Sequence, residues 1–218
     1  MKKGLLLLLT AMLALSAVYA QDVDILRRKY SQVSYGKNTF KHGDWKMKSD
    51  FSVNYTNGRT FYLHEEEVIG LIRFGIDGTW TDFTYSNYSR TLPWDGKNKA
   101  YKFHQIDYAL GVGPSVHINP VDDVYVHTYF RYAPTYSLFT GDKQVYGNYA
   151  TNFVTGLSVS YNFIALGFEG RFGNCNYDSL ISAKKAAEYI EQLKTNPLNQ
   201  ISEKVKNRGW RVYVSFMF

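Results

Sequence analysis

Charged side chains recur at every second position along several extended stretches of this sequence, and they are the first candidates for chemistry. In one stretch, Arg131 shares its parity with His127 and Tyr129, whereas Val126 and Phe130 hold the other parity. Side chains two apart in a strand point to the same face, so these charges would gather on one side of a sheet. The charged residues of this parity are Arg73, Asp77, Asp107, Arg131, Glu169, Arg171 and Arg211. Such groups would form a network of ion pairs if they were buried together, or would line a narrow path for ions or small solutes.

Two histidines of the same parity, His117 and His127, lie on either side of a turn at residues 119–123 that contains two aspartates. Catalysis would need a nucleophile and oxyanion donors as well, and Ser115 alone is weak support for a nucleophile. We therefore interpret both histidines as polar contacts near the edge of the sheet.

The remaining reactive residues give no further site. The stretch His64–Glu67, HEEE, lacks the second histidine of a helical zinc site, so we interpret it as a charged turn. Cys175 is the only cysteine, which excludes an internal disulfide. We expect no catalytic residue, no metal and no cofactor.

The elements that would position these side chains are strands. In residues 105–118, QIDYALGVGPSVHI, the odd positions are small or polar. The even positions are apolar: Ile106, Tyr108, Leu110, Val112, Pro114, Val116 and Ile118. This period of two predicts a strand with unlike environments on its two faces. Its length exceeds the roughly 9 to 11 residues with which a tilted strand crosses a bilayer. The same alternation recurs at residues 51–55, 72–80, 123–136, 146–161, 164–172 and 210–218.

Three places need a separate interpretation. Pro114 cannot donate to a strand ladder, so we expect a bulge or local break near it. Continuing the parity of residues 51–55 would turn Asn57 and Arg59 to the apolar side. We prefer a bulge at Asn57–Gly58 that flips the register, and a tight hairpin there is the alternative. The first strand is assigned to about residues 28–35.

The connections between these strands alternate in length. Short links at residues 64–67, 119–122 and 162–163 separate long ones. The long connections are residues 36–46, 87–99, 138–145 and 173–208. Short turns on one side and long loops on the other are typical of an outer-membrane barrel with its short side in the periplasm. The predicted fold is all-β: an eight-stranded antiparallel up-and-down transmembrane β-barrel.

The start of the chain is predicted to be a signal peptide. Lys2 and Lys3 precede the apolar run Leu5–Ala17, and small residues close the segment at Ala20. The barrel domain would then comprise residues 21–218. No later run of about 18 apolar residues predicts a membrane-spanning helix. Without Lys2 and Lys3 the formal charge falls from +6 to +4, and no Lys/Arg run of nucleic-acid type occurs, so no nucleic acid is expected as a partner.

One segment has a helical pattern. Residues 179–194, SLISAKKAAEYIEQLK, contain strong helix formers with an apolar face, and a second, shorter helix is expected to end near Lys206. Residues 179–206 are therefore predicted to form a helical insertion in the last and longest outer loop. It is a candidate lid, or a binding element for an extracellular or envelope protein partner.

The signal peptide, the repeated strand pattern and the terminal residues WRVYVSFMF together resemble the small Gram-negative outer-membrane β-barrel proteins of the OmpA, OmpX and OmpW type. They resemble even more closely the uncharacterised outer-membrane proteins with a β-barrel domain. The resemblance implies a location in the cell outer membrane and contact with its lipid. It also implies recognition by the barrel assembly machinery through a C-terminal signal of outward side chains: Trp210, Val212, Val214, Phe216 and Phe218.

The function expected from these observations is a structural or surface-interaction role without intrinsic catalysis. Three alternatives stay open: a narrow low-conductance pore for ions or small solutes, an envelope lipid-modifying enzyme such as a lipid A acyl hydrolase, and a soluble secreted barrel that binds an apolar ligand.

Overall fold

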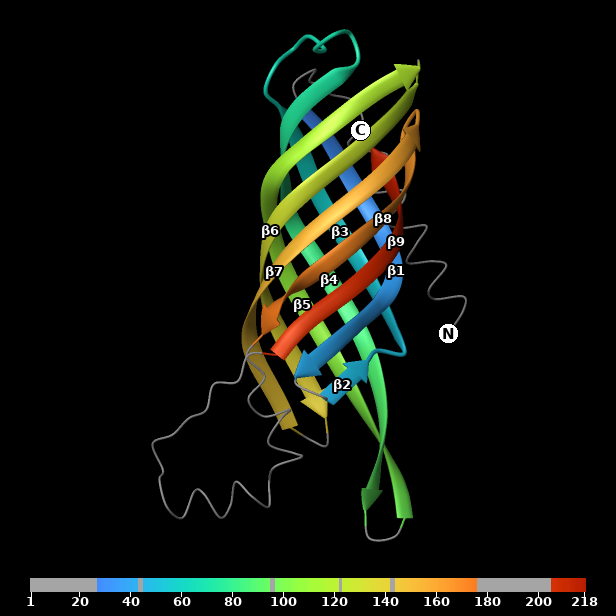
Figure 1. Cartoon of the computed structure of the whole chain (residues 1–218), viewed down its shortest axis with the longest axis vertical. Helices are drawn as coiled ribbons and strands as arrows, with labels where there is room; N and C mark the ends of the chain where they lie inside the picture. The colour runs from blue at the N-terminus through green and yellow to red at the C-terminus, as the bar shows by residue number, and fades with distance from the viewer. Residues whose placement is uncertain (1–26, 43–44, 95–96, 122, 142–143, 176–204) are drawn as a thin grey trace.

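Eight long strands hydrogen-bond side by side into a closed ring, as the repeated alternation predicts. In a computed structural model of the chain, every neighbouring pair is antiparallel, and β1 pairs with β9 to close the barrel. The structure describes residues 27–42, 45–94, 97–121, 123–141, 144–175 and 205–218. The all-β fold and the closed eight-stranded up-and-down barrel are thus confirmed (Figure 1).

The order around the ring follows the chain, with the short strand β2 attached at one end of β1. The strands are β1 (Arg27–His42), β2 (Trp45–Lys48), β3 (Phe51–Tyr62), β4 (Ile72–Trp94), β5 (Lys97–Val121), β6 (Val124–Gly141), β7 (Gln144–Tyr161), β8 (Ile164–Cys175) and β9 (Val205–Met217). β2 and β3 both pair with the same side of β1, at residues 39–42 and 27–36 of that strand.

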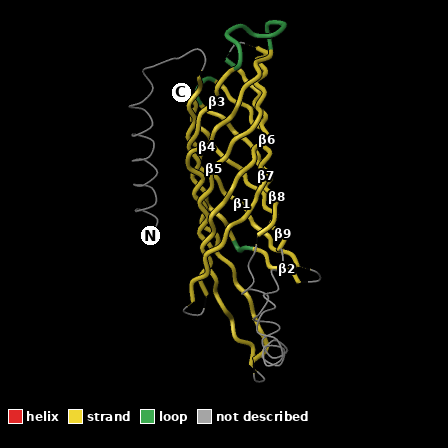
Figure 2. Tube along the Cα trace, turned by 90° about the vertical axis from the view of Figure 1, so that its left-hand side faces the viewer, coloured by secondary structure: helices red, strands yellow, loops and turns green. Residues whose placement is uncertain are grey.

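The two ends of the barrel differ as the connections predict. The connections after Tyr62, Val121 and Tyr161 are at the same end, which we call the short-turn end. At the opposite, long-hairpin end, β4 and β5 project farthest beyond the ring (Figures 1 and 2). Much of what was expected to be long loop there is strand: β1 runs on to His42 instead of ending near residue 35. The first short turn is longer than expected, because β4 begins at Ile72.

The two faces of the strands have the predicted character in the middle of the barrel. Apolar side chains such as Val212, Leu166 and Val112 are exposed on the outer surface, whereas Arg211, Glu169 and Ser115 are buried inside. The parity of β5 to β9 is confirmed throughout this part.

The β3–β4 ladder does shift its register between Asn57 and Gly58, where a bulge was expected, but the expected flip of β3 is wrong, and so is the alternative hairpin. β3 continues straight through this dipeptide, paired without a shift to β1, and Asn57 and Arg59 stay on the outer face. The irregularity lies on the partner strand, where Trp80 is an extra residue in β4. Gly58 has a packing reason instead, because a Cβ there would lie 2.2 Å from the Tyr30 hydroxyl.

Near Pro114, the β5–β6 ladder skips Gly113 and Pro114 and resumes at Ser115 in the same register. The strand itself is continuous, because both residues stay paired to β4, so only the ladder to β6 is locally interrupted and no bulge forms. The register shift of this strand pair lies farther on, between Ile118 and Val121.

At the long-hairpin end the two faces exchange their character. A cluster of buried side chains fills the interior of the barrel there, and we call it the apolar cluster. Its members are Phe40, Met47, Tyr88, Phe139, Ala150, Cys175 and Val205. On the outer face of the same strands, Lys37, Lys41 and Arg208 are exposed. This part of the barrel wall thus resembles a soluble β-protein, with its apolar side inward.

The predicted signal peptide of residues 1–20 and the predicted helix of residues 179–194 lie outside the described residues. The second helix was expected to reach Lys206, but Val205 and Lys206 already belong to β9. Among the residues that the structure describes, none forms a helix with the length and apolarity needed to cross a bilayer.

Candidate functional site: the polar interior of the barrel

Between the apolar cluster and the short-turn end, the interior is filled with charged and polar side chains in two groups. The group nearer the short-turn end is centred on Asp77 of β4, which is fully buried. Arg131 of β6 pairs with it, at 2.6 Å between Nε and Oδ1. The Tyr30 hydroxyl donates to the same carboxylate at 2.8 Å, and that of Thr60 at 3.0 Å. The guanidinium of Arg131 also lies 3.6 Å from the ring centroid of Tyr129, close enough for a cation–π contact.

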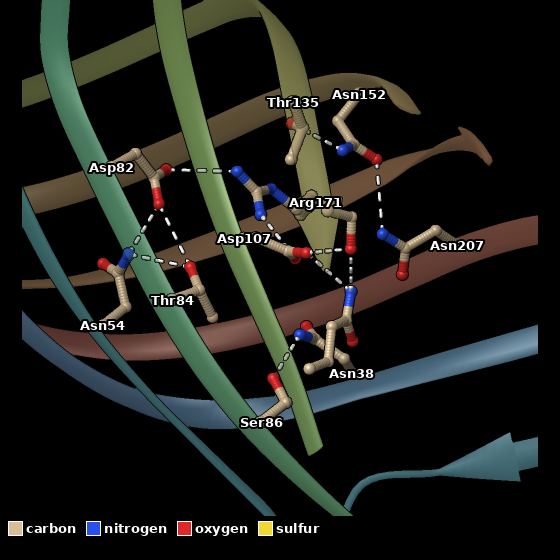
Figure 3. Close-up of polar contacts among 12 residues, drawn as sticks. Asn38, Asn54, Asp82, Thr84, Ser86, Asp107, Thr135, Asn152, Arg171 and Asn207 are labelled. Atoms are coloured by element: carbon tan, nitrogen blue, oxygen red, sulfur yellow. Dashed lines mark hydrogen bonds and ion pairs between the residues drawn. The ribbon is translucent and has the colours of Figure 1, made fainter. Parts of the chain in front are cut away.

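The second group is centred on Asp82, and it connects opposite walls of the barrel (Figure 3). Asp82 of β4 accepts from Arg171 of β8 at 3.2 Å and from Arg211 of β9 at 3.3 Å. Asn54 donates to it as well, at 2.6 Å. Because β4 and β8 lie four strands apart in both directions around the ring, the Asp82–Arg171 pair crosses the whole lumen.

Glu169 connects the two groups. One carboxylate oxygen accepts from Arg211 at 3.2 Å, and the other accepts from the Tyr129 hydroxyl at 2.7 Å. Tyr129 in turn contacts Arg131 of the first group. The charged side chains of the interior therefore form one continuous network along the barrel.

Asp107 of β5 lies at the edge of the network next to the apolar cluster. It accepts hydrogen bonds from Ser137 and Gln105, and its second oxygen is 3.8 Å from Arg171. Its neighbour Gln105 accepts from the hydroxyl of Tyr88, which belongs to the apolar cluster. Polar and apolar layers of the interior are thus joined directly.

Tyrosine rings fill the space that the charges leave, and glycines make room for them. The ring of Tyr129 packs over Gly156 on the neighbouring strand, where a Cβ would lie 2.3 Å from the ring. Tyr213 packs over Gly167 at the same distance. An eight-stranded barrel is only wide enough to be filled by its own side chains, and these pairs fill it.

The seven charged residues singled out in the sequence lie in different places. Six are buried in the network, and Arg73 lies at the short-turn end, partly exposed and 3.5 Å from Glu67. Asp82 was missed because the extra residue Trp80 exchanges the two faces of β4. The signal was present: apolar residues move to odd positions at Phe83 and Tyr85.

The two histidines are buried and stacked on each other, with ring centroids 3.9 Å apart. His127 is 3.9 Å from Asp77. The Oγ of Ser115 and the Nδ1 of His117 have no hydrogen-bond partner, so no serine–histidine pair forms here. Within the described residues, no group of three or more His, Cys, Asp or Glu side chains is arranged to hold a metal ion.

A cavity of about 590 Å³ opens at the short-turn end. Arg28, Arg73 and His117 line it, together with aromatic rings such as Tyr62 and Tyr125. Arg28 donates to the backbone carbonyl of Asn162 at 3.1 Å and lies over the Tyr125 ring. The cations of this mouth are therefore engaged in contacts with the barrel itself.

Comparison with known proteins gives structural likeness only. No protein-family model and no curated protein matches the sequence. Ail of Yersinia pestis, solved with the heparin analogue sucrose octasulfate, is 10% identical, with 88% of this chain and 99% of that chain covered and a TM-score of 0.45. Neisserial surface protein A is 12% identical over 87% and 97%, with a TM-score of 0.47. The outer-membrane protease OmpT of Escherichia coli is 7% identical over 88% and 96%, with a TM-score of 0.48. At this level of identity and superposition, these structures say nothing about what this chain binds or does.

Proposed function

We propose that this chain is an integral outer-membrane barrel whose interior is a closed plug, with a structural or surface-interaction role and no catalysis of its own. The observation that carries the proposal is that, in the middle of the barrel, polar side chains face the interior and apolar side chains face outward. Buried arginines and carboxylates fill the inside, while Val, Leu, Ile and Phe side chains cover the outside. In water this arrangement would be unfavourable, since apolar surface would be exposed. In lipid it is the arrangement expected of a spanning barrel.

The height of the apolar surface supports the same proposal. On β1, the outward positions change from Lys29 through Val33 and Tyr35 to Lys37. Eight residues separate Lys29 from Lys37, and at about 3.3 Å per residue and a tilt of about 40° they rise roughly 20 Å. This is comparable to the apolar band of roughly 25 Å in outer-membrane barrels, because lysine stems at the edge extend the apolar surface. Beyond this band, the apolar side chains face the interior and form the apolar cluster, as expected where the barrel wall leaves the bilayer.

A plug is favoured over a pore because the network leaves no charged group alone on one wall. The Asp82–Arg171 pair spans the lumen, and Glu169 holds Arg211 and Tyr129 beside it. Between this layer and the long-hairpin end, the apolar cluster occupies the described part of the interior. In such a plug the charges stabilise the barrel and carry no current.

Outward side chains of β9 would also act during assembly. Trp210, Val212 and Val214 are exposed on the outer face, and Phe216 has the same parity. They have the spacing of the proposed signal for the barrel assembly machinery, which ends at Phe218. The role of residues 179–206 in binding an extracellular or envelope partner remains a prediction from sequence.

Three measurements test this function. A membrane fraction should retain the protein after alkaline carbonate washing, and release into the aqueous phase without detergent would favour the soluble ligand-binding barrel. In planar bilayers, the purified protein should give traces without discrete steps. Conductance steps that change when Arg211 is replaced by Met would contradict the plug and establish the pore. An altered lipid A profile in cells that lack the protein would instead point to the lipid-modifying enzyme.

A further inference from the structure

Six cationic side chains gather on the outer wall of the barrel at its long-hairpin end. They lie on three adjacent strands, β2, β1 and β9, in the region where β2 joins the ring (Figure 1). We call this set the cationic patch: Lys37, Lys41, Lys46, Lys48, Lys206 and Arg208. All six side chains are exposed. The sequence does not reveal the whole patch, because Lys206 and Arg208 of β9 lie far along the chain from the four members on β1 and β2.

The pairing of the strands places three lysines side by side on adjacent strands. Lys41 of β1 lies opposite Lys46 of β2 on one side and opposite Lys206 of β9 on the other. The next row has Lys48, Thr39 and Arg208. Like charges directly opposite one another destabilise a sheet. This row therefore does not contribute to folding, and an anion outside the barrel would relieve its repulsion.

The wall itself supplies little compensating charge. The described outward positions of these strands at this end hold no acidic residue. Asp50, which follows β2, accepts a hydrogen bond from Ser89 at 2.6 Å. With six cations beside this one described carboxylate, the cationic patch carries a net positive charge, which attracts polyanions.

The position of the patch indicates which anion it meets. The last cation of the patch toward the middle of the barrel, Lys37, lies opposite Trp210. In the next outward row, Tyr35 lies opposite Val212. Aromatic side chains mark the level of the lipid headgroups in such barrels. Lysine stems extend along the wall while their ammonium groups reach the headgroup layer. The patch therefore faces sideways into the headgroups at the long-hairpin end.

We propose that the cationic patch binds the phosphate groups of an anionic lipid in the outer leaflet of the membrane. The proposal rests on the proposed function, because the barrel must sit in the membrane with its long hairpins outward. A lipid is favoured over a soluble polyanion because the cations lie on the side wall, directly beside the apolar surface that acyl chains would cover. One molecule can then satisfy both surfaces.

The test is a titration of the full-length mature protein in neutral detergent micelles with diphosphorylated lipid A, read by native mass spectrometry. The triple variant K41Q/K46Q/K206Q should bind at least about tenfold more weakly than the unmodified protein, as expected for three cations at a membrane surface. Rising salt should weaken binding to the unmodified protein. Equal affinity of the triple variant and the unmodified protein would overturn the proposal.

A matched control removes three cations from the other end of the outer wall. The variant R27Q/K29Q/R59Q should bind lipid A within twofold of the unmodified protein, and a loss as large as that of the first variant would also overturn the proposal. Dephosphorylated lipid A should bind weakly, and inorganic phosphate should not compete at equal concentration. Competition by inorganic phosphate would show an anion site without lipid specificity. Failure of the proposed function would be visible beforehand, as a protein that does not associate with micelles.

Discussion

The ion pair between Asp77 and Arg131 gives the sharpest prediction about the interior plug. In Asp77→Asn the side chain keeps its shape and one acceptor oxygen, and the hydroxyl of Tyr30 or Thr60 that then faces the amide NH2 can rotate to accept from it, but Arg131 loses its counter-charge. Arg131 is 3% exposed and 2.6 Å from the carboxylate. Breaking a buried pair in this way costs about 3–5 kcal/mol. The cation–π contact with Tyr129 partly compensates, so we expect a loss of about 3 kcal/mol.

The barrel also offers a matched control. Glu67 and Arg73 pair at 3.5 Å at the short-turn end, with 21% and 28% of their side chains exposed. Glu67→Gln removes the same charge from a solvated pair and should cost no more than about 1 kcal/mol.

The assay is urea unfolding of the refolded barrel in detergent micelles, followed by tryptophan fluorescence. A double variant, Asp77→Asn with Arg131→Met, should regain much of the loss, because no unpaired charge stays buried. If Asp77→Asn and Glu67→Gln cost the same, the interior at Asp77 is hydrated, and the plug would be refuted.

Three further changes test other parts of the account. Gly156→Ala would place a Cβ against the Tyr129 ring and should lower the free energy of unfolding by about 1–3 kcal/mol. The control Gly170→Ala, whose Cβ would lie 3.8 Å from its nearest neighbour, should be nearly neutral. Equal urea midpoints of the two variants would count against close packing at Tyr129. Phe139→Ala removes a ring of the apolar cluster and should cost about 3–5 kcal/mol, as in a soluble core; a loss below about 1 kcal/mol would mean that this end is not packed. Phe218→Ala should reduce the folded fraction in the outer membrane of cells without changing the stability of the refolded protein; normal assembly would exclude a role of Phe218 in the assembly signal.

The sequence predicts the barrel well wherever the strands run through the apolar band. There, one face must contact lipid and the other must contact the remaining strands, so alternation reports the environment directly. Residues 105–118 are the clearest case, since Tyr108, Leu110 and Val112 are outside and Gln105 and Asp107 inside.

Beyond the apolar band the same rule fails, because the outer face no longer contacts acyl chains. Phe40 turns inward and Lys41 outward, the reverse of the order in the middle of the barrel. This exchange explains why β1 was expected to end near residue 35. The local sequence pattern also could not show that Trp80 is an extra residue in β4, because the position of a bulge depends on the register of the neighbouring strands. That single residue decides that Asp82 faces inward.

The most direct test of the central premise, that the apolar face of each strand contacts lipid, is the accessibility of spin labels along β9 and β8. Single labels would be attached in a Cys175→Ser background, in barrels reconstituted into bilayers. Labels at Val212 and Leu166 should collide with oxygen dissolved in the acyl chains, and labels at Ser215 and Ala165 should be shielded from it. Greater access of a water-soluble relaxing agent to the first two positions would contradict the membrane-spanning barrel.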